Sequence, residues 1–113
     1  MPAEILNFID FAQYYSNLIQ KANHHAGKVR LSIPLILDWV LLNCDISSAR
    51  YKIYNGEIKN VIWIRNKTKD QKLVFTYNHK EQFIEVRTGK LTSPIIMKID
   101  NATQLLDLDK INQ

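Results

Sequence analysis

The sequence has 113 residues and a formal net charge of +4, and 46% of the residues are hydrophobic, 23% charged and 10% aromatic. This length and composition predict one packed domain over residues 1–113 and exclude disordered, collagenous and low-complexity classes. The single cysteine, Cys44, excludes an intramolecular disulfide framework. No apolar run approaches the ~20 residues of a membrane span, and residues 1–4 do not resemble a signal peptide, so we expect a cytoplasmic protein with no membrane partner.

The first third of the chain predicts two helices. Residues 3–26 have apolar side chains at spacings of three and four, which places them on one helical face. Gly27 suits the left-handed position after a helix end, and residues 28–33 alternate polar with apolar side chains, as a short edge strand does. Pro34 then fits the first turn of a second helix that ends near Leu42. This second helix is apolar almost all round, which is typical of a buried helix.

From Ala49 the period changes to two, which predicts antiparallel strands joined by hairpins. Asn55-Gly56 is a strong signal for a two-residue turn. Such a turn sets Tyr54 opposite Glu57, Ile53 opposite Ile58, Lys52 opposite Lys59 and Arg50 opposite Val61. A second hairpin is expected around residues 78–80, between strands 72–77 and 82–87.

A fifth strand, 95–99, and a short helix complete the predicted chain. Asp100 is expected to cap that helix, which runs from residue 101 to about 110. The predicted fold class is therefore α+β, with two N-terminal helices packed on a four- to five-stranded antiparallel meander and a short C-terminal helix.

Side chains alternate across the strands, so the hairpins predict one aliphatic face and one face that mixes cations with aromatic side chains. The aliphatic face comprises Ala49, Tyr51, Ile53, Ile58, Ile62, Ile64, Leu73, Phe75, Tyr77, Ile84 and Val86. Residues 50–99 carry eleven cations and four acids, so the positive charge of the protein is concentrated in the sheet. Such an asymmetry of charge is informative about partners.

The mixed face is the main candidate site, and two hypotheses compete for it. As a site for single-stranded RNA or DNA, it offers cations for phosphates and flat rings for bases; the candidate residues are Lys52, Tyr54, Lys59, Trp63, Arg65, Lys72 and Arg87. As an interface between two copies of the chain, it offers large apolar side chains that a solvated face does not need; the candidates are Val61, Trp63, Val74 and Phe83. We expect a non-enzymatic interaction protein that forms a homodimer through the open face of the sheet or its edge, with nucleic-acid binding as the alternative.

The sequence predicts no catalytic residue, metal ligand or cofactor. His24 and His25 are adjacent, so they point about 100° apart on a helix and lack the i, i+4 spacing of a metal pair. Cys44 ends the second helix without a histidine nearby in sequence, which favours a buried structural thiol. Glu81 and Glu85 are better explained as balancing the basic face than as an acid–base pair.

The size, the basic charge and the order of helices before an antiparallel meander resemble RelE-type toxins that cleave messenger RNA. The resemblance is one of composition and layout, since the sequence shows no opening strand before its first helix and no matching motif. It implies RNA cleavage as a less favoured alternative, in which His79 would be the available base and Arg65 a cation at the phosphate.

Overall fold

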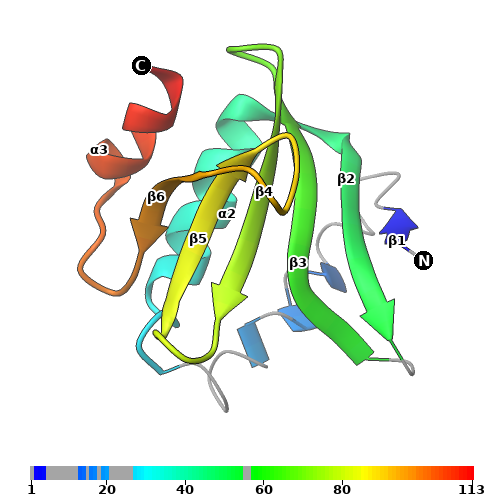
Figure 1. The fold of residues 1–113 in the computed structure, drawn as a ribbon, viewed down its shortest axis with the longest axis vertical. Helices are drawn as coiled ribbons and strands as arrows, with labels where there is room; N and C mark the ends of the chain where they lie inside the picture. Colours follow the sequence, from blue (N-terminus) through cyan, green and yellow to red (C-terminus); the bar gives the residue numbers. More distant parts are fainter. Residues whose placement is uncertain (1, 5–12, 15, 18, 21–26, 55–56) are drawn as a thin grey trace.

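The computed structural model describes residues 2–4, 13–14, 16–17, 19–20, 27–54 and 57–113, and for residues 2–4, 52–54 and 57–60 it describes the backbone only. Figure 1 shows a twisted sheet with helix α2 across one face. The elements are β1 (Pro2–Glu4), α2 (Ser32–Asn43), β2 (Cys44–Tyr54), β3 (Glu57–Asn66), β4 (Gln71–Asn78), β5 (Phe83–Thr88), β6 (Ile95–Ile99), α3 (Leu105–Leu108) and a 3₁₀-helix, η1 (Asp109–Asn112).

The sheet is an antiparallel meander, so the predicted α+β class is confirmed. Six strands lie in the order β1-β2-β3-β4-β5-β6, and each pairs with its neighbours in sequence. The second hairpin forms between β4 and β5, and the fifth predicted strand is β6. The Asn55-Gly56 turn itself lies outside the described residues, but Tyr54 pairs with Glu57 and Ile53 with Ile58, as the turn predicts.

The prediction of two N-terminal helices is not matched. Pro2–Glu4 form strand β1, which pairs with residues 50–52 of β2, so the chain does have an opening strand. Most of the predicted first helix lies outside the described residues, and those of its members between 13 and 20 that are described are helical. The predicted strand at 28–33 is wrong: residues 27–31 form a turn, and α2 begins at Ser32.

Helix α2 begins early because its first residues close a turn. The Ser32 hydroxyl donates to the carbonyl of Val29 at 2.6 Å, which fixes the turn just before the helix. Pro34 then occupies the first helical turn, where its missing N–H costs no hydrogen bond. The helix ends at Asn43, and Cys44 passes directly into the extended backbone of β2.

The C-terminal helix is shorter than predicted and begins later. Asp100 caps a turn, because its carboxylate accepts from the backbone N–H of Ala102 at 2.9 Å. Helix α3 begins instead with a reciprocal capping box between Gln104 and Asp107. Asp100 therefore does cap a segment of the chain, but that segment is a turn and not the predicted helix.

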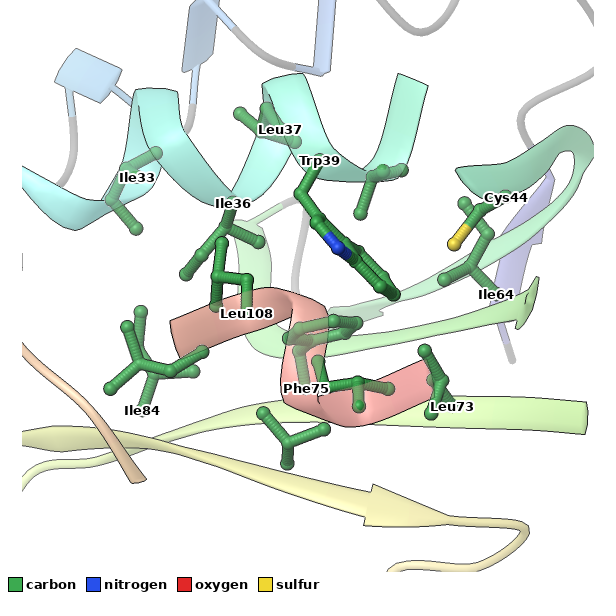
Figure 2. Packing of buried hydrophobic residues seen from close by; sticks show 14 of the residues in the cluster. Ile33, Ile36, Leu37, Trp39, Cys44, Ile64, Leu73, Phe75, Ile84 and Leu108 are labelled. Atoms are coloured by element: carbon green, nitrogen blue, oxygen red, sulfur yellow. The ribbon is translucent and has the colours of Figure 1, made fainter. Parts of the chain in front are cut away.

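The core lies between α2, the sheet and the C-terminal segment, as Figure 2 shows. The predicted aliphatic face is confirmed for its described side chains: all are buried in the core or packed against it. Trp39 of α2, together with Leu108 and Ile111 of the C-terminal segment, closes the core from the other side. In the described part of the chain, no helix is long and apolar enough to cross a membrane.

Two irregularities in the β2–β3 pairing separate the observed register from the predicted one. Arg50 pairs with Trp63 instead of Val61, a shift of two residues that keeps each side chain on its predicted face. A second irregularity lies between Asp45 and Arg50. There the Ser48 hydroxyl donates to the carbonyl of Asp45 and accepts from the N–H of Arg65, which satisfies polar groups that the ladder leaves open.

Candidate functional site

The face of the sheet opposite α2, here called the outer face, contains those singled-out residues whose side chains are described. Strand register places Trp63 next to Val74, and Val74 next to Arg87. One row toward the β3–β4 turn, Arg65 lies opposite Lys72. The structure thus brings Trp63, Arg65 and Lys72 together at one end of the outer face. Lys52, Tyr54 and Lys59 lie toward the other end of β2 and β3, where only the backbone is described.

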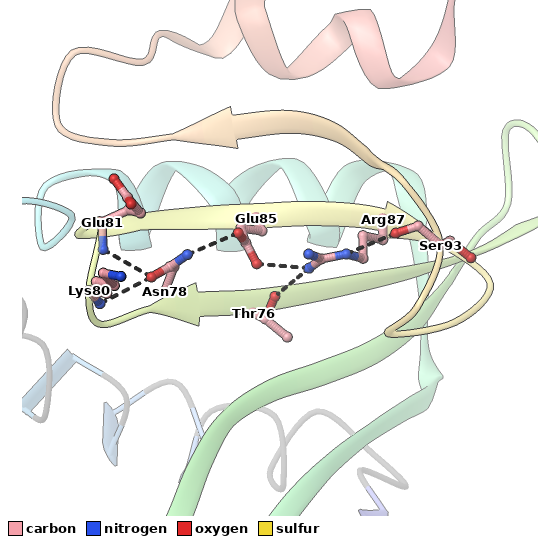
Figure 3. A network of polar contacts seen from close by, with 7 residues as sticks. All are labelled: Thr76, Asn78, Lys80, Glu81, Glu85, Arg87 and Ser93. Atoms are coloured by element: carbon pink, nitrogen blue, oxygen red, sulfur yellow. Dashed lines mark hydrogen bonds and ion pairs between the residues drawn. The ribbon is translucent and has the colours of Figure 1, made fainter.

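Arg87 belongs to a polar network on the outer face (Figure 3). Its guanidinium forms an ion pair with Glu85 at 2.9 Å and also donates to the hydroxyl of Thr76 and the carbonyl of Ser93. The side chains of Arg87 and Glu85 are only 16% and 13% exposed. The Arg87 charge is therefore paired within the chain, and its guanidinium makes three hydrogen bonds there.

Glu85 is held as a carboxylate by the same network. Desolvation alone would raise the pKa of Glu85, but hydrogen bonds from Asn78, Arg87 and Thr76 and the charge of Arg87 outweigh it and lower the pKa. The amide of Asn78 donates to Glu85 at 3.1 Å, and its oxygen caps the β4–β5 turn by accepting from the N–H groups of Lys80 and Glu81. The network thus fixes the β4–β5 hairpin and shows the features of a structural ion pair.

The apolar candidates of the outer face are covered to different degrees. Val74 is 0% exposed although it lies outside the main core cluster. It is flanked by Trp63 and Arg87, and the hydrogen bond from Arg87 to Ser93 holds the loop between β5 and β6 against this face. Val61, Trp63 and Phe83 are half-buried, and the ammonium of Lys98 lies 4.7 Å from the centre of the Phe83 ring. Val74 therefore needs no second subunit to be buried.

The end of the outer face near the β3–β4 turn is strongly basic. Exposed cations lie there on β3, the β3–β4 turn, β4 and the start of the β5–β6 loop: Arg65, Lys67, Lys69, Lys72 and Lys90. Lys90 joins this group because the N–H of Gly89 donates to the carbonyl of Lys72 at 2.9 Å. Two carboxylates stand among the cations, and Asp70 forms an exposed ion pair with Arg65. We call these five cations, with Asp45, Asp70 and Trp63, the basic end.

The charged groups of the basic end shift one another's pKa values toward the ionised forms. The Asp70 carboxylate raises the pKa of Arg65 through a hydrogen bond and its charge. Hydrogen bonds from Ser47, followed by the charges of Lys67 and Arg65, hold the pKa of Asp45 below its ordinary value. Five cations thus face two carboxylates at this end of the sheet.

Further exposed apolar side chains lie between residues 91 and 106, a part of the chain that the sequence analysis did not single out. Leu91, Ile95 and Ile96 belong to β6 or the loop before it, and Leu105 and Leu106 belong to α3. Figure 3 shows α3 beyond β6, the last strand of the sheet. We call these five residues the apolar margin. The adjacent pair Ile95-Ile96 was a possible signal, since strict alternation buries only one of two neighbours on a strand.

The groups needed for RNA cleavage are not brought together. His79 follows β4 at the β4–β5 turn, where its ring lies 4.8 Å from that of Tyr77, whereas Arg65 pairs with Lys72 at the other end of β4. Six to seven strand residues separate the two groups, which corresponds to roughly 20 Å. Cys44 is buried, and burial raises the pKa of its thiol to about 12. Among the described residues, no group of three or more His, Cys, Asp or Glu is placed to hold a metal ion, and His24 and His25 lie outside them.

Comparison with known protein families gives a match over most of the chain. A protein-family model described as "Integron cassette protein VCH_CASS1 chain" matches residues 11–109. A search of the curated proteins finds no match. The matched span includes α2, β2 to β6 and α3, and hence both the basic end and the apolar margin. The chain therefore belongs to this family of integron cassette proteins.

Proposed function

We propose that the protein is a non-enzymatic interaction protein that works as a homodimer, with the apolar margin as the contact between copies. The observation that supports this is the concentration of exposed apolar side chains: of the eight large ones among the described residues, five lie between residues 91 and 106. Soluble monomers rarely expose a continuous apolar patch without using it as an interaction site.

The charges beside the margin favour a second copy over a partner of a single sign. Lys98 and Lys110 flank Asp100, Asp107 and Asp109, so the segment carries charges of both signs. In a twofold interface each surface meets itself, and a mixed pattern lets a cation of one copy meet an acid of the other. A strongly basic partner would meet repulsion from the two cations, and a strongly acidic partner from the three acids.

The edge of β6 disfavours pairing of strands across the interface. The register of β6 shifts between the pairs Val86–Met97 and Arg87–Ile95, which leaves Ile96 as an extra residue. Pro94 precedes the strand, and the exposed Lys98 lies within it. A bulge, a proline and a lysine are common ways to prevent edge-to-edge extension. The proposed contact is therefore side-chain packing of β6 and α3 rather than one continuous sheet.

Sedimentation velocity across a range of micromolar concentrations tests the proposal. We expect a dimer for the wild type, and at least a tenfold weaker dimer for Ile96→Lys combined with Leu106→Lys. The matched control is Leu42→Lys on α2, because Leu42 and Leu106 are 75% and 76% exposed and are chemically identical. A thermal unfolding curve for each variant verifies that the fold is retained.

Two results would contradict the proposal in different ways. A wild type that remains a monomer at the highest concentration overturns the dimer itself. A dimer that persists in the margin variant but is lost in Val61→Lys with Phe83→Lys overturns the choice of surface, and assigns the interface to the outer face. Both outcomes are read from the same sedimentation experiment.

A further inference from the structure

We infer that the basic end is a binding site for single-stranded nucleic acid, in which Trp63 stacks on a base and the surrounding cations bind phosphates. This site is separate from the apolar margin and does not depend on the proposed dimer. It narrows a sheet-wide candidate surface to one end, where the cations are exposed. One of them, Lys69, also donates to the carbonyl of Gln113 at 2.7 Å.

The cations of the basic end come from four segments that the fold brings together. Arg65 ends β3 and Lys72 begins β4, and these two residues are register partners. Lys67 and Lys69 stand on the turn between them, and the backbone bond from Lys67 to the carbonyl of Asn43 ties that turn to the end of α2. Lys90 arrives from the β5–β6 loop beside Lys72. This convergence presents positive charge over a surface rather than at a single point, which suits a chain of phosphates.

Trp63 adds an aromatic ring for stacking, which a purely electrostatic patch lacks. It lies two residues before Arg65 on the same strand, so both side chains are on the outer face, about 7 Å apart along the strand. Its neighbour Val74 is fully buried, which supports one side of the indole, while Trp63 itself remains partly exposed. A ring fixed by packing and flanked by cations is the arrangement on which unpaired bases stack.

The position of Trp63 favours single-stranded nucleic acid over duplexes and over acidic proteins. In a duplex the faces of the bases are hidden by their neighbours, so Trp63 would have no surface to stack on. An acidic peptide would use the lysines but would gain nothing specific from the indole. We therefore expect the contribution of Trp63 to distinguish these partners.

Arg87 is excluded from the site by its contacts. Its guanidinium is occupied by Glu85, Thr76 and Ser93, and recruiting it to a phosphate would leave Glu85 without its cation. Arg65, in contrast, forms its ion pair with the exposed Asp70, and such a pair exchanges readily with solvent or a ligand.

Fluorescence anisotropy with labelled oligothymidylate and oligouridylate at low salt tests the site. We expect both to bind, and a duplex of the same length to bind at least tenfold more weakly. Trp63→Leu, which keeps an apolar side chain against Val74, is expected to lose about tenfold or more in affinity, whereas Trp63→Phe keeps most of it. The thermal stability of both variants is measured first, so that a loss of binding is not a loss of fold.

Salt dependence tests the cations separately. Each neutralised phosphate of a single strand contributes about −0.7 to the slope of log K against log salt. Lys72→Gln is expected to reduce that slope by about one such step. Lys80→Gln is the matched control, since Lys80 is exposed at the opposite end of β4 and is expected to leave the slope unchanged.

Asp70→Asn gives a test in the opposite direction. Asp70 has φ 50°, a left-handed conformation that asparagine also adopts, so the turn is kept while the acid is removed. Release of Arg65 is expected to tighten binding several-fold.

The inference is overturned if neither oligonucleotide binds at low salt, if the duplex binds as tightly as the single strands, or if Trp63→Leu binds as wild type does. None of these results bears on the dimer, which is read by sedimentation.

Discussion

Arg87 shows how the neighbours of a side chain decide what it can do. In the sequence it is one of eleven cations between residues 50 and 99, and nothing distinguishes it from Arg65. In the structure Arg87 is 16% exposed and paired with Glu85, while Arg65 is exposed and paired with Asp70 at the surface. A charge pattern therefore predicts which face is basic, but only the packing shows which cations remain available.

The Glu85–Arg87 pair leads to a prediction about stability and pH. Arg87→Met is expected to lower the free energy of unfolding at neutral pH by about 1–3 kcal/mol, because it leaves the carboxylate of Glu85 half-buried without its charged donor. The folded-state pKa of Glu85 is depressed from its ordinary value of 4.5. The pair therefore stabilises the fold above that value and stops doing so as the pH falls through the folded pKa. The loss of unfolding free energy caused by Arg87→Met should therefore become smaller as the pH is lowered into the acid range.

Urea unfolding curves at neutral and acid pH measure this effect. The matched control is Arg65→Met, which breaks the exposed pair with Asp70 and is expected to change stability by less than about 0.5 kcal/mol. Equal effects of the two substitutions at neutral pH, or a cost of Arg87→Met that does not change with pH, would contradict the structural role assigned to the pair.

At the scale of the elements, local signals predicted strands and turns well, and register less well. The period of two after Ala49 and the Asn55-Gly56 dipeptide predicted β2 to β5 and the pairing of Tyr54 with Glu57. They did not predict the shift that sets Arg50 opposite Trp63, because extra residues at a bulge need no special side chain. Strand β1 was missed for a related reason: three residues are too few to show a period, and only β2 makes them a strand.

The C-terminal segment is fixed by contacts that are remote in sequence, which explains why its helix was misplaced. Asn66, at the end of β3, is 0% exposed. Its amide donates to Asn112 at 2.6 Å, and Asn112 in turn donates to Asn43 at the end of α2. The Trp39 indole donates to Asp109 at 3.1 Å. These hydrogen bonds join α2, β3 and η1, and no local sequence pattern predicts them.

Asn66→Ala is expected to destabilise the protein by about 2–4 kcal/mol. The substitution removes a buried side chain and leaves the oxygen of Asn112 and the N–H of Thr68 without their partner. Urea unfolding provides the measurement. The matched control is Asn101→Ala: the Asn101 side chain also makes two hydrogen bonds, to Leu31 and Gly27, but it is exposed, so water replaces the lost partner. We expect the control to cost about 1 kcal/mol or less. A control as costly as Asn66→Ala would argue against the role given to burial.

At the scale of the whole molecule, the sequence predicted a basic sheet with one buried face, and the fold decided where the accessible features gather. Residues 65–72 were already visible as a cluster of cations, but their meeting with Lys90 depends on the β5–β6 loop. The apolar margin combines residues of β6 and the loop before it with residues of α3, the helix that follows the last strand. Sequence analysis thus predicted residues for the basic end and none for the apolar margin.

The position of Cys44 makes it a probe of the opening of the whole molecule. The thiol is 2% exposed within the core cluster, where α2 passes into β2 (Figure 2). Burial raises its pKa to about 12, so the thiolate is scarce at pH 8. Any reagent that needs the thiolate must therefore wait for the core to open.

Labelling of Cys44 by a thiol-reactive disulfide reagent is accordingly expected to require global unfolding. Its rate in native protein should rise with urea in parallel with the equilibrium unfolding constant, because exposing this thiol means separating α2 from the sheet. The control is Thr92→Cys in a Cys44→Ala background, since Thr92 is exposed in the β5–β6 loop and its thiol should react at once and independently of urea. A Cys44 rate that is fast in the absence of urea, or that ignores urea, would mean that the junction of α2 and β2 opens without the rest. The contacts of Trp39, Asn43 and the C-terminal segment with this junction argue that it opens only when the whole core does.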